Sequence, residues 1–506
     1  MPIINKPATG PFTRRERIII TVPVLMASLL HAVNMSTAYV ALPNIQGNLS
    51  ATPDQIGWII TAFVVASAVG TVLTGFFSSR FGRRNVFLAA IVGFTLTGGL
   101  CASATGLVDL VLFRMLQGFV SAPLLPISQS IMLDTYPRER HGFAMSIWSM
   151  GMILGPVLGP TIGALVTEWY GWRLVFFINV PLGVVAFIGI ALTLPEAARG
   201  RQRFDWLGVT TLIVGVSALQ LMLDRGQQLD WFESLEIQLE AAVAVLCLYM
   251  FVVHSLTSSA PYLDLSMFTD RNYAVGLCLI FIFGIAAFAT MFILPLFLQA
   301  VQHYPVLTAG WLLSARGLGT MLAMFSSGLL ADRFPPKYLI LCGLLCIGIS
   351  SLVMTGWSAE VEMHEVIWMI VLSGFGMGMM WVSLTTVTFS TLSPELRVDA
   401  AALFALVRAI GASMGTSVTV AVLVRSSQVN YIELKDHISS GREYLTALAP
   451  QIWSIDSTSG LLSMYKLVLS QAQMIGFINT FMMLSVVIFA TVPLVFFFKS
   501  KPKSAH

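Results

Sequence analysis

Apolar runs long enough to cross a lipid bilayer recur along the whole chain, and they constrain its fold more than any other feature. A membrane-spanning helix needs about 20 mainly apolar residues. Fourteen runs of this kind occur in the 506 residues. They cover approximately residues 18–42, 54–78, 85–105, 108–132, 142–167, 173–194, 206–223, 236–257, 273–300, 308–331, 337–357, 364–388, 399–424 and 475–498. The pattern predicts an all-α polytopic membrane protein with fourteen transmembrane helices.

The composition agrees with this interpretation and argues against several classes of function. Hydrophobic residues make up 56% of the chain and charged residues only 10%, which is too little charge to cover a water-soluble protein of this size. The sequence contains no phosphate-binding loop, no His-Glu-x-x-His helix and no Cys-x-x-Cys pair. We therefore expect a non-enzymatic protein without metal or cofactor, driven by an ion or substrate gradient. The net charge of +3 gives no indication of a nucleic-acid partner, and none is expected.

Lysine and arginine residues are unevenly distributed between the two sides of the predicted bundle. With the N-terminus placed in the cytoplasm, nineteen of the 28 fall in the tails and cytoplasmic connections, and six fall on the opposite side. Positively charged connections stay in the cytoplasm, so both ends of the chain are expected there. Arg14, Arg15 and Arg17 precede a first run that is too long for a cleaved signal peptide, which predicts a retained first span.

An internal repeat divides the chain. The segment 75–84 after the second run resembles the segment 328–337 after the tenth, and a glycine pair in the fifth run recurs at a similar offset in the thirteenth. This spacing indicates two related halves in the same orientation, as in transporters whose halves rock about a central site. The predicted organisation is a cytoplasmic tail (1–17), a six-helix half (18–194), a linker with two inserted helices (195–257), a second six-helix half (258–498) with an outer loop at 425–474, and a cytoplasmic tail (499–506). Short helices are expected in the outer loop.

One arginine lies deep inside a predicted span. Arg114, in the sequence Arg-Met-Leu-Gln-Gly, is several residues inside the fourth run. A charge at the centre of a bilayer costs at least about 2.5 kcal/mol, so the guanidinium is expected to face the bundle interior and to have a partner. Gln117, one turn away, is a candidate to share a contact with water or substrate. The alternative is a structural arginine bonded to backbone carbonyl groups.

Glycine and proline recur at short spacing in the fifth run. The segment holds Gly151, Gly155 and Gly159, with Pro156 and Pro160 between and after them. Glycine lets a neighbouring helix approach closely, and proline removes a backbone hydrogen bond and permits bending. We interpret the segment as a hinge for gating. A tight helix crossing that does not move is the alternative.

A tight, basic connection follows the second run. It contains Gly75, Arg80, Gly82, Arg83 and Arg84. Positive charges of this kind hold a connection in the cytoplasm, and the glycines and arginines together also suit a hinge and charge lock between neighbouring helices. The pattern Gly-x-x-x-x-Arg-x-Gly-Arg-Arg resembles the signature loop of the major facilitator superfamily.

The resemblance to the major facilitator superfamily covers nearly the whole chain. The Arg114 segment resembles the fourth-span motif of the family, and residues 151–163 resemble the antiporter motif of its fifth span. One departure concerns the signature loop. Ser79 stands where the family usually has an acidic residue, which the second copy of the loop keeps as Asp332.

Longer segments narrow the resemblance to one branch of that family. They are residues 124–130, 172–183 and 221–232. The chain resembles the fourteen-span drug:proton antiporter branch (EmrB/QacA type), and most closely the EmrB-type efflux subunits. The resemblance implies a major facilitator fold in the bacterial inner membrane and efflux of amphipathic or hydrophobic compounds in exchange for protons. It also implies a periplasmic adaptor leading to an outer-membrane channel.

The first span departs from that family. The family usually has Leu-Asp-x-Thr there, and the matching positions begin with Val33, Asn34 and Ser36. Asn34 can form hydrogen bonds but cannot carry a proton. His31, three residues earlier, can titrate near neutral pH and is a candidate to replace the acid, with a structural core histidine as the alternative. Asp224 at the end of the seventh run is a further candidate, and an ordinary solvated or paired carboxylate is its alternative.

Aromatic and methionine side chains are dense in the fifth, ninth and twelfth runs. Such side chains suit an adaptable pocket for apolar ions, although most of them must pack or face lipid. The candidate pocket residues are Gln117, Trp148, Met152, Phe288, Phe292 and Trp381. The pattern does not distinguish which of them line a pocket.

These features favour a secondary multidrug exporter that works by alternating access and exchanges its substrate for protons. A dedicated exporter of one endogenous metabolite, with altered or no proton coupling, is the alternative that the missing acid of the first span suggests. A receptor that transports nothing would need a signalling domain, and no connection in the chain is large enough to hold one.

Overall fold

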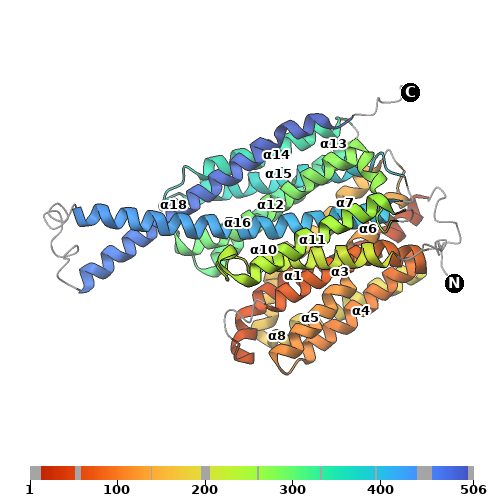
Figure 1. The fold of residues 1–506 in the computed structure, drawn as a ribbon, viewed down its shortest axis with the longest axis horizontal. Coiled ribbons are helices and arrows are strands. Elements are labelled where there is room, and N and C mark those ends of the chain that lie inside the picture. Colours follow the sequence, from red (N-terminus) through yellow and green to blue (C-terminus); the bar gives the residue numbers. More distant parts are fainter. Residues whose placement is uncertain are drawn as a thin grey trace.

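The computed structural model describes residues 13–51, 58–137, 140–194, 205–258, 261–330, 333–393, 396–440 and 458–499, and all regular secondary structure in these ranges is helical (Figure 1). The first helices are α1 (Arg14–Leu49), α3 (Trp58–Phe81), α4 (Arg83–Ser103), α5 (Leu107–Ser121), α6 (Leu124–Thr135), α7 (His141–Tyr170), α8 (Trp172–Phe177), α9 (Asn179–Thr193), α10 (Trp206–Arg225), η2 (Trp231–Glu233) and α11 (Leu235–Thr257). The others are η3 (Leu265–Thr269), α12 (Arg271–Ala300), α13 (Val306–Leu330), α14 (Pro336–Met354), α15 (Met363–Phe389), α16 (Arg397–Ser440), α18 (Thr458–Thr491) and η5 (Val492–Phe497).

Twelve segments of the described chain are long and apolar enough to cross a membrane. The helices α5 and α6 form one such segment, and α8 and α9 form another. The prediction of an all-α membrane protein is therefore confirmed. Two further helices, α7 with 30 residues and α13 with 25, include side chains outside the described part of the chain and are not among the twelve. The count of fourteen spans stays a prediction.

The same helix pairings occur twice in the bundle. In the first part of the chain α1 packs on α7, α3 on α5 and α4 on α9. In the second part α12 packs on α16, α13 on α15 and α14 on α18. The helices α10 and α11 pack on each other, and α10 also contacts α3 and α16 (Figure 1). The bundle thus contains two groups of helices with similar packing, and an additional pair in which α10 touches both groups.

The two ends of the bundle differ. At one end, which we call the terminal end, the first turns of α1 meet the end of α6, where the hydroxyl groups of Thr21 and Tyr136 are 3.1 Å apart. At the same end, the backbone N–H of Lys499 donates a hydrogen bond to Asn272 Oδ1 (2.9 Å) at the start of α12. At the opposite end, α16 and α18 extend beyond the other helices (Figure 1).

The extension of α16 and α18 differs from the outer loop that the sequence predicts. Instead of short helices within 425–474, α16 continues to Ser440 and α18 begins at Thr458. Residues 416–440 contain neither glycine nor proline, so no local signal ends the helix where the apolar run stops. We call residues 425–440 and 458–474 the projecting hairpin. The rings of Tyr431 and Tyr465 join its two helices, with centroids 6.0 Å apart.

Candidate functional site

Arg114 of α5 is fully buried in the first group of helices. Its Nη1 donates hydrogen bonds to Asn34 Oδ1 on α1 (2.7 Å) and to Gln117 Oε1 on its own helix (2.9 Å). The guanidinium carbon lies 4.4 Å from the centroid of the Phe63 ring. The structure therefore brings together three of the residues singled out in the sequence. Neutral amide oxygens and an aromatic ring are among the partners of this charge.

His31 lies beside the same aromatic ring. The centroids of the His31 and Phe63 rings are 5.8 Å apart. The Nδ1 atom of His31 is buried and has no hydrogen-bond partner among the described residues. The positive charges of Arg408 and Arg114 both act on the imidazole. A proton on His31 would thus add a charge to a region that is already cationic.

Two further arginines, which the sequence interpretation did not include in the site, lie in the second group of helices, and the charge of one of them, Arg408, acts on His31. Arg316 Nη2 on α13 donates a hydrogen bond to Thr290 Oγ1 (2.7 Å). Arg408 on α16 lies over the ring of Trp381, at 5.8 Å from its centroid. Within the described part of the chain, no ion pair includes Arg316 or Arg408. Both are charges inside an apolar run, which is the same signal that identified Arg114.

Two tryptophans from opposite groups of helices meet at the centre of the bundle. Trp148 on α7 and Trp381 on α15 stack with ring centroids 6.4 Å apart and an interplanar angle of 15°. Trp381 Nε1 donates to Ser149 Oγ on α7 (2.6 Å), and Trp148 Nε1 donates to Ser28 Oγ on α1 (3.1 Å). Both indole N–H groups are thus satisfied, which holds the rings in place.

The remaining predicted pocket residues have different surroundings. Met152 is partly buried and packs against the main hydrophobic core. Phe288 and Phe292 on α12 are 36% and 37% exposed. These two rings therefore take no part in the stacked centre, although they lie on a helix that borders it.

The glycine motif of α7 forms a close crossing with α1. A Cβ on Gly155 would lie 2.4 Å from the Cβ of Ala32, and one on Gly159 would lie 2.5 Å from Ser36 Oγ. Ser36 Oγ donates a hydrogen bond to the Gly155 carbonyl across the crossing (3.0 Å). Gly151 packs against a leucine side chain of α1 in the same manner. This contact is the tight crossing that the glycine spacing allows.

The prolines of that motif lie within one helix. The helix α7 runs from His141 to Tyr170 and includes positions 156 and 160. The side chains of Pro156 and Pro160 lie outside the described part of the structure. Their role as a hinge stays a prediction.

Asp134 at the end of α6 joins the two groups of helices at the terminal end. Its Oδ2 accepts a hydrogen bond from Arg83 Nη1 of α4 (2.5 Å), and its Oδ1 accepts one from Arg397 Nη1 of α16 (2.5 Å). Arg83 Nη1 also donates to Ser130 Oγ (3.0 Å). Hydrogen bonds between charged partners are about twice as strong as neutral ones, so this carboxylate locks α4 to α16.

The other residues of the basic connection differ in their contacts and conformation. Arg84 Nη2 donates a hydrogen bond to the Ala191 carbonyl of α9 (2.7 Å). Gly82 has φ of 85°, a conformation that favours glycine and lets the chain turn sharply between α3 and α4. Arg80 is exposed. The three arginines of this connection therefore divide between the interface, the neighbouring helix and solvent.

A further contact at the terminal end joins α3 to α16. Gly75 lies so close to Asp399 that a Cβ on the glycine would be 1.7 Å from the carboxylate Oδ1. In the second copy of the loop, a Cβ on Gly328 would lie 2.7 Å from the Cβ of Ser146 on α7. Ser146 Oγ also donates to the Met324 carbonyl of α13 (2.5 Å). We call these contacts, together with the two ion pairs of the α6 carboxylate, the terminal gate.

Asp224 lies between the inserted helix α10 and α16. Its Oδ1 accepts hydrogen bonds from Gln220 Nε2 (3.2 Å) and from Ser413 Oγ. Among the described residues, no ion pair includes this carboxylate. It is therefore held by neutral donors.

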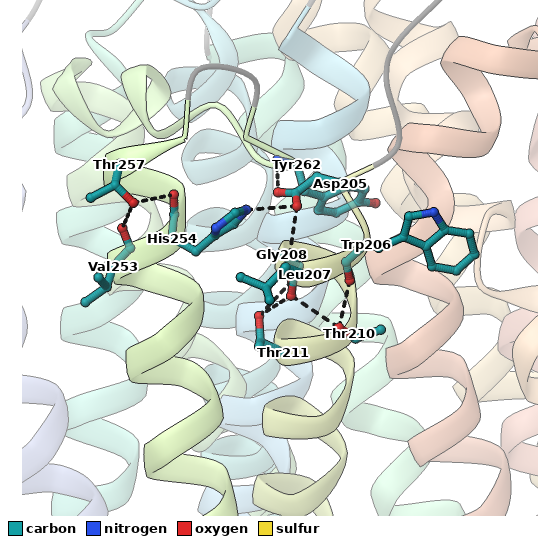
Figure 2. A network of polar contacts seen from close by, with 10 residues as sticks. All are labelled: Asp205, Trp206, Leu207, Gly208, Thr210, Thr211, Val253, His254, Thr257 and Tyr262. Atoms are coloured by element: carbon teal, nitrogen blue, oxygen red, sulfur yellow. Dashed lines mark hydrogen bonds and ion pairs between the residues drawn. The ribbon is translucent and has the colours of Figure 1, made fainter.

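Figure 2 shows how the ends of the inserted helices are joined at the terminal end. Asp205 Oδ1 accepts a hydrogen bond from Gly208 N (3.0 Å) and lies 2.8 Å from His254 Nε2, while its Oδ2 accepts one from Tyr262 N (3.0 Å). Burial by itself would raise the pKa of Asp205, but these hydrogen bonds together lower it below its ordinary value. The Tyr262 hydroxyl donates to the Val72 carbonyl of α3. The same cluster therefore connects the inserted pair to the terminal gate.

Comparison with known proteins identifies the family. The sequence profile of the Major Facilitator Superfamily matches residues 24–416. The chain is 30% identical over 455 residues to the multidrug export protein EmrB of Escherichia coli (strain K12), with 88% of each chain covered. It is 33% identical over 488 residues to the fatty acid resistance protein FarB of Neisseria gonorrhoeae, covering 95% of this chain and 96% of the relative.

A solved structure shows the same fold. The human organic anion transporter MFSD10 matches with a TM-score of 0.61 and 15% identity, covering 95% of this chain and 99% of that one. Three observations agree with this family. They are the repeated helix packing in the two groups, the basic connection between α3 and α4, and the extensive sequence match. The chain belongs to the major facilitator superfamily and, within it, is of the EmrB type.

Proposed function

We propose that this protein is a secondary active multidrug exporter, which moves amphipathic or hydrophobic compounds out of the cell in exchange for protons by alternating access. The terminal gate is the observation that carries the proposal, because Asp134 closes it with ion pairs to Arg83 and Arg397 from opposite groups of helices. Alternating access requires contacts that can break at one end of a central site while the other end closes. The names of the EmrB relatives, which are multidrug export proteins, support this function.

In this proposal the terminal end faces the cytoplasm of a bacterium, and the protein lies in the inner membrane. The distribution of lysine and arginine in the sequence supports this orientation. With α7 and α13 counted, fourteen helices span the membrane. The halves 18–194 and 258–498 move against each other, and the helices within 195–257 are an insertion between them. The tails 1–17 and 499–506 lie in the cytoplasm.

The cations at the centre favour anionic amphiphiles as substrates. Arg316 and Arg408 lie inside apolar helices, and no ion pair of the described residues includes either of them. A buried charge is costly without a compensating partner, and the carboxylate of a bound substrate would supply one. FarB is named for resistance to fatty acids and MFSD10 for transport of organic anions, which supports the same substrate class.

Transport by purified protein in proteoliposomes tests the export function. We expect movement of a fluorescent long-chain fatty acid, driven by a proton gradient. Arg316→Gln and Arg408→Gln should each reduce this movement by about tenfold, because loss of a hydrogen bond between charged partners costs about 1.5–3 kcal/mol. Arg425→Gln, at an exposed position of the projecting hairpin, is the control. Wild-type protein that moves neither this probe nor a panel of drugs, with or without a gradient, would refute the export proposal.

The group that carries the proton is a separate question. His31, in the field of two arginines, and Asp224, held by neutral donors, are the two candidates that the sequence indicates. If His31 carries the transported proton, His31→Gln should reduce substrate-induced proton release from purified protein, and Asp224→Asn tests the carboxylate in the same way. Unchanged release from one variant excludes that residue.

One observation favours a second candidate function, a dedicated exporter of a single endogenous metabolite with altered or no proton coupling. The Arg114 guanidinium contacts the amide of Asn34, at the position where the family usually carries an acid. Metabolite profiling of a deletion strain separates the two functions. Accumulation of one compound with unaltered drug sensitivity would favour the dedicated exporter.

The projecting hairpin is our candidate for the binding site of a periplasmic adaptor, which would lead to an outer-membrane channel. Its described helices expose several large apolar side chains, which are Val429, Ile432, Leu461, Leu462 and Tyr465. Exposed apolar side chains on a helical surface suit contact with another protein. Affinity purification of the tagged protein should recover the adaptor, and replacement of residues 425–474 by a short flexible linker should abolish the recovery. Adaptor retained after this deletion would place the contact elsewhere.

A further inference from the structure

A small cavity lies at the terminal gate, where both groups of helices and the inserted pair meet. Its lining comes from α3, α10, α16 and the segment after α11. It includes Gly75, Tyr262 and Asp399, and the other lining residues are aliphatic. Asp399 is thus the one charged residue in the lining of this cavity. The contacts around the cavity must change if the two halves separate.

The carboxylate of Asp399 has no cationic partner in the described part of the structure. No ion pair or hydrogen bond among those residues includes its oxygens. Its Oδ1 is closely packed against the backbone of Gly75. The charge that acts on it is that of Asp264, a second carboxylate.

Other titratable groups on the helices around the cavity do not neutralise this carboxylate. At the terminal end of these helices they are the exposed Arg80 on α3, Asp134 on α6, Asp205 before α10, Tyr262 after α11, Asp270 and Tyr273 at the start of α12, the exposed Arg271 over the Phe497 ring, and Arg397 on α16 itself. Asp134 is bonded to Arg397, and Asp205 lies at hydrogen-bond distance from an imidazole nitrogen. The two phenols are neutral at physiological pH. The helix α18 has no titratable side chain between Lys466 and its end at Thr491.

We propose that Asp399 is a proton-binding group of the terminal gate, which takes up a proton when the gate closes and releases it to water when the gate opens. Closure moves the carboxylate from water to an aliphatic cavity and keeps it near Asp264, and both changes favour the neutral acid. On opening, water reaches the carboxylate, and its position in the first turn of α16 favours the anion. A low pH at the terminal face therefore favours the closed gate. The inference rests on the alternating-access function proposed above.

The sequence of the basic connection fits this assignment. The first copy has Ser79 where the second has Asp332. Asp399, on the opposing helix α16, contacts Gly75 at the start of the segment 75–84. It therefore places a carboxylate next to the copy of the loop that lacks its own. A group on α16 leaves the loop when the halves separate, whereas an acid within the loop would not.

The distance across the gate, measured between two spin labels, tests the proposal without any transport assay. The full-length protein, with its five native cysteines replaced, carries labels at Phe81→Cys on α3 and Tyr338→Cys on α14, both exposed positions. We expect the ratio of closed to open protein to fall as the pH is raised, by at most about tenfold per pH unit for one linked proton. Asp399→Asn, which stays neutral, should remain closed at every pH.

Two further variants make the result decisive. Asp264→Asn, at an exposed carboxylate, should keep a pH response. The proposal is overturned if Asp399→Asn responds to pH as the wild type does. Should that variant fail to fold, Asp399→Glu replaces it, and an unchanged midpoint of the response would equally overturn the proposal. A gate that responds to pH in a protein that exports no compound would instead refute the proposed function and leave the proton site standing.

Discussion

Single residues at the centre of the bundle show how a membrane protein keeps a buried charge. The Arg114 guanidinium bonds to two amide oxygens and lies over the face of Phe63. Each contact offsets part of the cost of removing the charge from water. Because the contacts come from three helices, α1, α3 and α5, the charge also fixes how these helices pack.

We predict that Asn34→Leu destabilises the protein. The substitution removes one acceptor of the buried guanidinium, and a hydrogen bond to a charged group contributes about 1.5–3 kcal/mol. The midpoint of thermal unfolding in detergent should fall by several degrees. Asn44→Leu, at an exposed position of the same helix, is the control. Equal midpoints for the two variants would show that the contact contributes nothing.

A second prediction at this scale concerns pH. The pKa of Asp205 is lower in the folded protein than its ordinary value of 3.8. Its hydrogen bonds therefore stabilise the protein above pH 3.8, and this contribution is lost as the pH falls through the lower, folded value. Asp205→Asn should be less stable than the wild type at neutral pH, and the difference should shrink below pH 3.8. Unfolding curves of the wild type and of Asp205→Asn at a series of pH values measure this difference in stability. A difference that does not depend on pH would contradict the prediction.

Among whole helices, the pairing of α1 with α7 depends on small side chains. A Cβ at position 155 meets Ala32 at 2.4 Å, so Gly155→Ala must push the helices apart at a cost of about 1–3 kcal/mol. Gly99→Ala on α4 meets nothing within 4 Å, and it should be neutral or stabilising because alanine favours helix. Thermal unfolding of both variants is the measurement. A stable Gly155→Ala protein would mean that the crossing is looser than described.

The helical elements were largely predictable from the sequence, and their contacts across the bundle were not. The length of each apolar run predicts a span, and the glycine spacing of the fifth run predicts a close crossing. Neither pattern indicates that Trp148 meets Trp381, or that Gly75 meets Asp399, because these residues are far apart in the chain. Arg316 and Arg408 carried the same signal as Arg114, yet a charge inside a span does not reveal which helices surround it.

In the whole molecule, the terminal gate joins the two groups of helices, and the proposed alternating access requires these contacts to break. Asp134→Asn removes the carboxylate that binds both Arg83 and Arg397, so the closed arrangement should lose at least about 1.4 kcal/mol, a factor of ten in population. A membrane-impermeant thiol reagent should then label Ser146→Cys several times faster from the terminal face. Asp109→Asn, on the opposite end of α5, is the control. Equal labelling rates would show that the ion pairs do not hold the gate.

The continuity of α16 has a mechanical consequence. One helix of 44 residues carries Arg397, Asp399 and Arg408 and then leaves the bundle as part of the projecting hairpin. At 1.5 Å per residue it is about 66 Å long, so a tilt of about 10° around its middle would move its far tip by roughly 6 Å. The helix is therefore a lever. A partner protein bound to the outer end of α16 would be displaced when the gate opens. By resisting that movement, the partner would stabilise the closed gate.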